Sequence, residues 1–409
     1  MSLKILLISF LGIITGIITG FLPGLSINNL IPIFLSITIF SNFELSIFLV
    51  SCSISQILSQ FFPSIFLGAP NESSSISVLP GHKLLLKGKG YEAYKICLVS
   101  CLLSLIFSTI LIFLIQSYFQ KFYYFIREYV FYLIFFVSVY TILTEKTLTK
   151  ILKSVLVFSL SGFLGLIVLN SPYPSSNLMF PMLSGFFGIS SLIVSLKEKS
   201  YLPKQEISEK INIDKKELVK SSLIGAIFGL IVGFLPGVGV SQAAIMAQNI
   251  LNIYNERSFL ATISSINLAN EIFSLNSLYL VGNPRSGTSV ALQRILKEID
   301  YTTFLILIST IVLVVSISIP ILLIVSKKVY KILLKVNYTL LNISIIFFIF
   351  LCVYYFTGLF GVAVCVTSTS IGLLPILLKV KRSHCMGCLL FPTMLFFSGY
   401  NSVLIGILF

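Results

Sequence analysis

The sequence has few charged residues. Asp, Glu, Lys and Arg make up 10% of its 409 residues, whereas hydrophobic residues make up 56% and the mean hydropathy is +1.03. A water-soluble domain has about 25% charged residues. The shortage therefore excludes a soluble globular protein and predicts an all-α integral membrane protein with many spans.

The length of the apolar sequence sets the number of spans. At about 20 apolar residues per span, the chain has room for about 10 to 14 transmembrane segments. The pattern predicts separate spans at 93–118 and 122–143, and also at 336–357 and 358–378. We expect a multi-pass protein of the cell membrane.

Histidine is scarce, and the cysteines are scattered. The two histidines, His82 and His384, have no second catalytic group beside them, which argues against an enzyme. The seven cysteines are spread over apolar segments, which argues against a disulfide framework. His384, Cys385 and Cys388 have the chemistry of metal ligands, but no second pair completes a four-ligand site. We therefore expect neither a metal site nor a cofactor.

The net charge of +14 comes from Lys and Arg in short connectors between the apolar segments. This distribution is the positive-inside pattern of a membrane protein surrounded by lipid. It is not the clustered patch that nucleic acid requires, so we expect no nucleic-acid partner.

One sequence pattern occurs twice, about 213 residues apart. Residues 12–29 are GIITGIITGFLPGLSINN and residues 225–242 are GAIFGLIVGFLPGVGVSQ. Each copy is followed by a polar Gly-x-Pro segment, GAPNESSSIS at 68–77 and GNPRSGTSVA at 282–291. A repeated pair of interrupted hydrophobic segments is typical of secondary transporters, whose substrates bind near the bilayer midplane.

The duplication divides the chain into two membrane repeats, residues 1–196 and 221–409. A polar linker at 197–220, which we expect in the cytoplasm, joins them. Equivalent points in the two repeats differ in positive charge, which favours an inverted arrangement in the membrane.

Each copy contains residues that interrupt a helix. Proline lacks an N–H group and disfavours helical geometry before it, while glycine permits unusual backbone angles. We expect broken or re-entrant helices that line a cavity, although a packed proline kink is the alternative. The predicted breaks are Pro23, Gly24, Gly68, Pro70, Pro236, Gly237, Gly282 and Pro284.

Polar side chains beside these breaks are candidates for binding an organic anion. Hydroxyl and N–H donors at the start of a half-helix would suit a carboxylate, and Arg285 would add a positive charge. Alternatively, Arg285 pairs with Glu72 or is solvated at the membrane surface. The candidates are Ser26, Asn28, Asn29, Asn71, Ser73, Ser74, Ser75, Ser241, Gln242, Arg285, Ser286, Thr288 and Ser289.

Acidic residues within apolar stretches indicate a coupling ion. Glu72 and Glu271 fit this description, and Asn270 lies beside Glu271. These groups could ligate Na⁺ or relay a proton. The alternative is a structural role in which Glu271 pairs with Arg285.

Four sequence elements occur in an order that is found in a known family of membrane proteins. They are GFLPGL, GAPNESSSISVLPGHKLLLKGKGYEAY, GFLPGVGVSQAA and LANEIFSLNSLYLVGNPRSGTSVAL. In this respect the chain resembles the large membrane subunit of the tripartite tricarboxylate transporters. The resemblance implies a permease for di- or tricarboxylates, driven by Na⁺ or H⁺. It also implies a small membrane subunit and an extracytoplasmic binding protein as partners. The other interpretations are a channel or a transporter of another small solute, and the sequence does not distinguish a monomer from a homo-oligomer.

Overall fold

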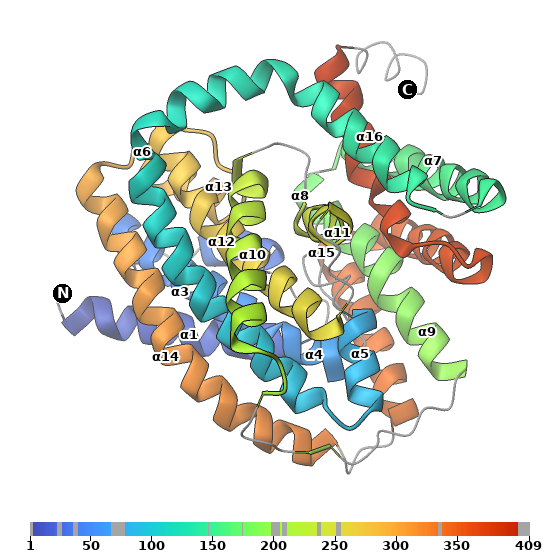
Figure 1. The fold of residues 1–409 in the computed structure, drawn as a ribbon, viewed down its shortest axis with the longest axis horizontal. Coiled ribbons are helices and arrows are strands. Elements are labelled where there is room, and N and C mark those ends of the chain that lie inside the picture. Colours follow the sequence, from blue (N-terminus) through green and yellow to red (C-terminus); the bar gives the residue numbers. More distant parts are fainter. Residues whose placement is uncertain are drawn as a thin grey trace.

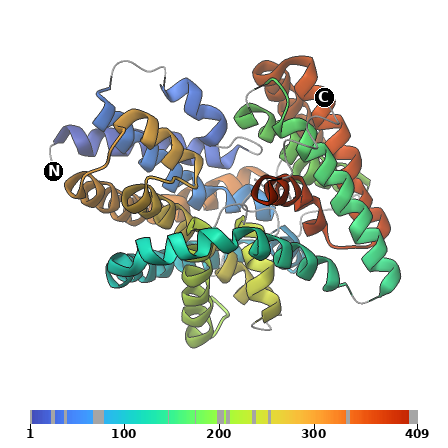
Figure 2. The same cartoon turned by 90° about the horizontal axis from the view of Figure 1, so that it is seen from above.

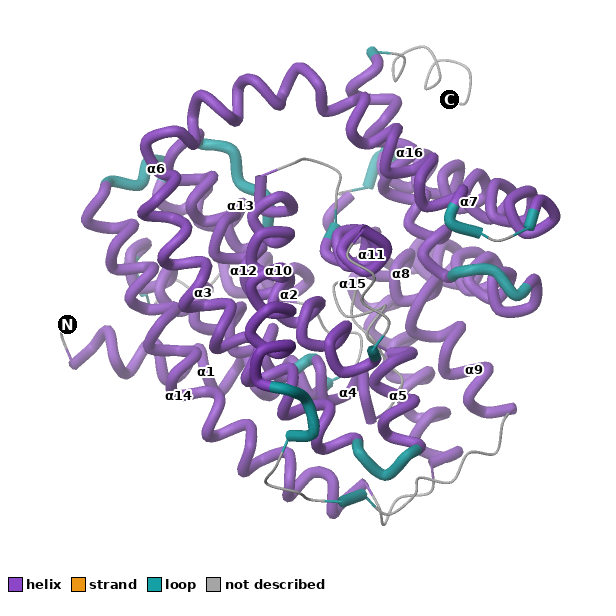
Figure 3. The backbone as a smooth tube through the Cα atoms, in the orientation of Figure 1, coloured by secondary structure: helices purple, strands orange, loops and turns teal. Residues whose placement is uncertain are grey.

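The computed structural model describes most of the chain, and in that part every regular element is a helix (Figure 3). This confirms the all-α fold class. The described residues are 3–22, 27–35, 40–66, 78–145, 147–173, 175–197, 205–206, 211–234, 239–250, 255–333 and 338–399.

The helices follow one another in this order. The first half of the chain contains α1 (Leu3–Phe21), α2 (Ile27–Leu35), α3 (Asn42–Ser59), α4 (Phe61–Phe66), α5 (Val78–Leu86), α6 (Gly90–Leu143), α7 (Leu148–Leu169), α8 (Ser175–Leu183), the π-helix η2 (Ser184–Ile189) and α9 (Ser190–Lys197). The second half contains α10 (Lys215–Phe234), α11 (Val240–Ile250), α12 (Glu256–Val281), α13 (Gly287–Leu296), α14 (Tyr301–Leu333), α15 (Tyr338–Leu378), the 3₁₀-helix η3 (Arg382–Met386) and α16 (Gly387–Ser398).

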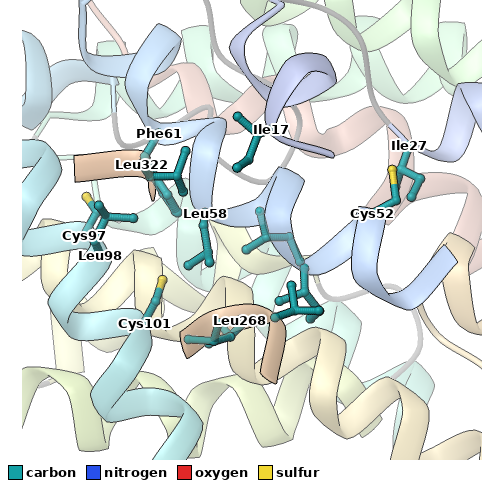
Figure 4. Packing of buried hydrophobic residues seen from close by; sticks show 14 of the residues in the cluster. Ile17, Ile27, Cys52, Leu58, Phe61, Cys97, Leu98, Cys101, Leu268 and Leu322 are labelled. Carbon is teal, nitrogen blue, oxygen red and sulfur yellow. The ribbon is translucent and has the colours of Figure 1, made fainter. Parts of the chain in front are cut away.

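The helices form two groups, each built from both halves of the sequence (Figures 1 and 2). In the first group α1 packs on α3, α10 packs on α12, and α6 and α14 pack against these pairs. In the second group α15 and α16 pack against α7, α8 and α9. Figure 4 shows part of the apolar core of the first group, a single buried cluster to which Ile17, Leu58 and Leu268 contribute from three different helices.

Helix α6 connects the two groups (Figure 1). The predicted span at 93–118 lies within a candidate membrane span at Gly90–Tyr118, but the connector expected between it and 122–143 is absent, because α6 is one continuous helix of 54 residues. No glycine or proline follows Gly90 within it, so nothing in the sequence interrupts the helix. At 1.5 Å per residue it is about 80 Å long. That length exceeds the bilayer core, and the helix curves over one side of the molecule.

Helix α15 contains the other predicted boundary. Gly358 has φ 63° and ψ −159°, a non-helical conformation that divides α15 into two helical parts. The spans expected at 336–357 and 358–378 therefore meet at the predicted residue. Glycine tolerates this positive φ because it has no Cβ.

Seven helices in the described part are long and apolar enough to cross a membrane. Two shorter apolar helices lie at Ile134–Leu143 and Leu178–Val194. Helix α12 has 26 residues but is rich in serine and asparagine, so it does not belong to this set. The protein is a multi-pass membrane protein, and the number of spans beyond these stays a prediction.

Glycine at every fourth position brings two helix pairs into close contact. A Cβ added at Gly12 of α1 would lie 2.6 Å from the Cβ of Ser51 on α3, and the Ser55 hydroxyl donates to the Gly12 carbonyl at 3.4 Å. Similarly, a Cβ added at Gly233 of α10 would lie 2.6 Å from the Cβ of Phe273 on α12. These contacts hold α1 against α3 and α10 against α12. Helices α1 and α10 are the ones that precede the two Leu-Pro-Gly segments.

Residues between the two halves bind the first group of helices. The side-chain oxygen of Gln205 accepts a hydrogen bond from the Gly90 N–H at 2.6 Å, and its amide nitrogen donates to the Leu85 carbonyl at 2.8 Å. The Gln205 N–H donates to the Tyr330 hydroxyl at 2.8 Å. Helix α10 begins at Lys215, inside the segment expected to be a linker.

Candidate functional site

The turn between α12 and α13 is the predicted break that the structure describes. Helix α12 ends at Val281, and Gly282 caps it in the left-handed conformation with φ 66°. Helix α13 starts at Gly287, where the Ser286 side chain accepts a hydrogen bond from the Ser289 N–H. Gly282 and Pro284 therefore lie in a turn that separates two helices, and Ser286 caps the second one.

Glu271 lies opposite this turn on α12 and is 9% exposed. Its Oε1 accepts hydrogen bonds from the Ser53 hydroxyl of α3 and the Ser286 hydroxyl, each at 3.1 Å. Thr288 of α13 also donates to this carboxylate. Three hydroxyl groups from two different helices and the capping turn therefore meet at one buried carboxyl group.

No lysine or arginine forms a salt bridge with Glu271 among the described residues. The salt bridge between Glu271 and Arg285, which was the alternative interpretation, is therefore not found among the described residues. A buried carboxylate without a positive partner carries a desolvation penalty of several kcal/mol. A bound proton or a bound cation would remove that penalty, so the group suits ion binding.

The backbone of the turn is held by a serine of α12. The Ser274 hydroxyl accepts from the N–H groups of Arg285 and Ser286 at 2.9 and 2.6 Å. It donates to the Ser289 hydroxyl at 3.1 Å. The turn is thus fixed against α12, with its hydroxyl groups directed to the neighbourhood of Glu271.

The remaining described candidates lie on α12, in the turn, on α11 and on α2. Asn270 is half-buried on α12 next to Glu271, and Arg285 is half-buried in the turn. Ser241 is buried on α11, which packs against α10 and α12. Asn28 and Asn29 lie within α2 and Gln242 lies within α11. The predictions that fall outside the described residues are Pro23, Gly24, Ser26, Gly68, Pro70, Asn71, Glu72, Ser73, Ser74, Ser75, Pro236 and Gly237.

Gln56 of α3 is a residue of the site region that the sequence analysis missed. Its Oε1 accepts from the N–H of Ile27, the first residue of α2, at 2.6 Å. Its Nε2 donates to the Thr19 hydroxyl, in the last turn of α1, at 3.0 Å. One buried amide thus connects the two helices on either side of the first Leu-Pro-Gly segment. The signal was a glutamine inside the apolar stretch that follows this segment.

His384 lies away from this site, in the connector between α15 and α16. Its Nε2 is 3.1 Å from Glu145 Oε1, which also accepts from the Lys381 N–H at 2.9 Å. Burial lowers the pKa of His384 below its usual value, although Glu145 acts in the opposite direction. Burial acts to raise the pKa of Glu145, but the bonds from Lys381 and His384 hold that pKa below its usual value. His384 therefore forms a buried pair with Glu145, and it directly precedes Cys385 in the sequence.

Comparison with known proteins agrees with this architecture. The chain matches the model of the tripartite tricarboxylate transporter TctA family over residues 6–387. It is 34% identical over 403 residues to uncharacterized protein MJ1079 of Methanocaldococcus jannaschii, with 96% of this chain and 98% of that protein covered. No solved structure matches. The matched family consists of membrane transporters and not of enzymes. The chain therefore belongs to the tripartite tricarboxylate transporter TctA family.

Proposed function

We propose that this chain is a permease that moves di- or tricarboxylate anions across the cell membrane, coupled to a Na⁺ or H⁺ gradient. Family membership supports a transport subunit. The observation that carries the coupling is Glu271, a buried carboxyl group bound by hydroxyls and without a salt bridge among the described residues. Ionisable groups inside membrane segments commonly mark ion pathways.

The proposed coupling between ion binding and substrate binding depends on the hydroxyl groups that donate hydrogen bonds to Glu271. Ser286 and Thr288 at the start of α13 bind its carboxylate, so the turn has the chemistry to bind a carboxylate. A proton or Na⁺ at Glu271 would weaken these bonds and release the hydroxyls. A substrate carboxylate would then accept from them and from the positive end of α13.

The remaining candidates extend this scheme to both halves of the chain. The proposed substrate region combines residues 68–75 with residues 282–289. Backbone carbonyls near Pro23 and Pro236 would contribute to the cation site. The chain would act as two repeated halves, with the polar segment at 197–220 between them, and alternating access would expose the site to each side in turn.

The tripartite family supports partner subunits. We propose a small membrane subunit and an extracytoplasmic binding protein that delivers the anion.

Uptake into liposomes tests the proposal. The purified chain, alone and together with the two partner subunits, would be assayed with labelled citrate and succinate under an inward Na⁺ gradient, an inward H⁺ gradient or neither. We expect accumulation above the external concentration with one of the two gradients. Equilibration without accumulation would indicate a channel. The absence of carboxylate uptake with all three components would contradict the substrate class.

A further inference from the structure

The second half of helix α6 has a stripe of exposed aromatic side chains along one side. Because successive residues of a helix are about 100° apart, the spacing of these side chains places them within an arc of about 60°. Each is between 48% and 69% exposed, and Lys121 is exposed beside them. The members of this aromatic stripe are Tyr118, Phe125, Tyr129, Tyr132 and Phe136.

The opposite side of the same segment packs on the protein. The Gln120 side-chain amide donates to the Leu280 carbonyl, in the last turn of α12, at 2.6 Å. Further along α6, Ile134 and Ser138 are buried. Gln120, Ile134 and Ser138 lie about 160–200° around the helix from Tyr118. The segment therefore has one side on the protein and one aromatic side directed to its surroundings.

The exposed side chains of α6 change in character at Tyr118, where the candidate span Gly90–Tyr118 ends. Before that residue, the large apolar side chains that are exposed have no polar atom; they are Leu102, Ile106, Ile110, Phe113 and Leu114. From that residue on, tyrosines form most of the stripe, and Lys121 adds a positive charge. Wholly apolar side chains suit the hydrocarbon core, whereas tyrosine is enriched at the membrane–water interface and lysine extends its ammonium group to it. The change therefore indicates that α6 reaches the interface near Tyr118.

The length and path of α6 indicate the same position. The span Gly90–Tyr118 has 29 residues and is about 43 Å long, which is enough to cross the hydrocarbon core and both headgroup regions. The helix continues without a break to Leu143. A straight continuation would project about 37 Å into water with its aromatic stripe uncovered. Instead, α6 curves from the first group of helices to the second, where it packs on α16 (Figures 1 and 2).

We propose that residues 118–136 of α6 lie along the membrane–water interface and bind the lipid bilayer through the aromatic stripe. The rings of Phe125 and Phe136 enter the boundary between headgroups and acyl chains, while the tyrosine hydroxyls and the Lys121 ammonium group face the headgroups. Apolar area and positive charge together hold such a helix at the surface. The helix that connects the two groups thus runs in the plane of the membrane. This inference depends neither on the anion transported nor on the coupling ion.

The sequence contains no tryptophan, so a single introduced tryptophan is the only one in the protein and reports its own depth in the bilayer. The test variants are Phe125→Trp and Tyr132→Trp, which each exchange one aromatic residue of the stripe for another. The control is Ile106→Trp, at an exposed position near the middle of the preceding span. Each full-length protein would be reconstituted in phosphatidylcholine vesicles with bromine atoms at either a shallow or a deep acyl position. The ratio of fluorescence quenching by the two lipids gives the depth of the ring.

We expect Phe125→Trp and Tyr132→Trp to report the same shallow depth, about 5–10 Å into the boundary between headgroups and acyl chains, and Ile106→Trp to report a deeper position. Depths that differ by about 10 Å between the two test variants would mean that α6 continues across the bilayer, and would overturn the proposal. Quenching of the control but of neither test variant would also overturn it, because water or another protein would then cover the stripe. If Phe125→Trp does not fold, Tyr118→Trp takes its place, and the depth difference that would overturn the proposal becomes about 21 Å.

Discussion

Replacing Gly12 by alanine should loosen the contact between α1 and α3. The new methyl carbon would lie 2.6 Å from the Cβ of Ser51 and 2.8 Å from the carbonyl oxygen of Phe48. Carbon atoms pack best at about 3.5–4.0 Å, so the helices would have to separate by about 1 Å. Overpacking of this kind costs about 1–3 kcal/mol. The upper end applies, because the Phe48 oxygen is part of a helix backbone and cannot rotate away.

Alanine also favours the helix by about 1 kcal/mol relative to glycine. The expected net loss of stability is therefore about 2 kcal/mol, the difference between about 3 for overpacking and about 1 for helix propensity. Gly188→Ala is the control, since a Cβ there would meet only the Ile349 side chain at 3.9 Å. Unfolding midpoints in detergent should fall for Gly12→Ala and not for Gly188→Ala. Equal midpoints for the two variants would refute the close contact between α1 and α3.

Three further predictions concern the site and the second group of helices. Replacing both Ser74 and Ser289 by alanine should weaken carboxylate uptake without affecting membrane insertion; unchanged uptake kinetics would remove them from the substrate site. Gln56→Met should lower the stability by about 1–3 kcal/mol, because the Ile27 N–H loses its hydrogen bond, and it should also slow carboxylate uptake. A variant with wild-type stability and wild-type uptake would contradict this. Below about pH 6.5 the unfolded chain binds a proton at His384 before the folded chain does, so the stability should fall as the pH drops. His384→Gln should reduce this fall below about pH 6.5, measured by thermal unfolding, and an unchanged slope would mean that His384 does not cause it.

The composition was sufficient to predict the fold class, because a sequence with so little charge cannot cover a water-exposed surface. Glycine and proline also located the turn at Gly282 and Pro284, and the span boundary predicted between 357 and 358 coincides with the kink at Gly358. The continuous helix α6 could not be predicted in the same way. A polar sequence within it resembles a connector, and hydropathy alone cannot distinguish a connector from a helix that extends beyond the bilayer.

The candidate site could be predicted only in part. The unusual position of an acidic residue in an apolar stretch singled out Glu271, and the Gly-x-Pro pattern singled out Ser286. Their contact with Ser53 depends on how α3 crosses α12 and α13, which no local pattern specifies. Gln56 escaped notice for the same reason, since its partners lie 29 and 37 residues away in the sequence.

Transport by a Glu271→Gln variant tests the central claim most directly. The variant keeps the shape of the side chain but cannot bind a proton and has no charge for Na⁺. Liposomes containing it, together with the partner subunits if the wild type needs them, would be assayed for gradient-driven citrate uptake and for citrate exchange. We predict that gradient-driven uptake is lost while exchange persists. Uptake that still follows the ion gradient at the wild-type rate would contradict the role of Glu271 in coupling.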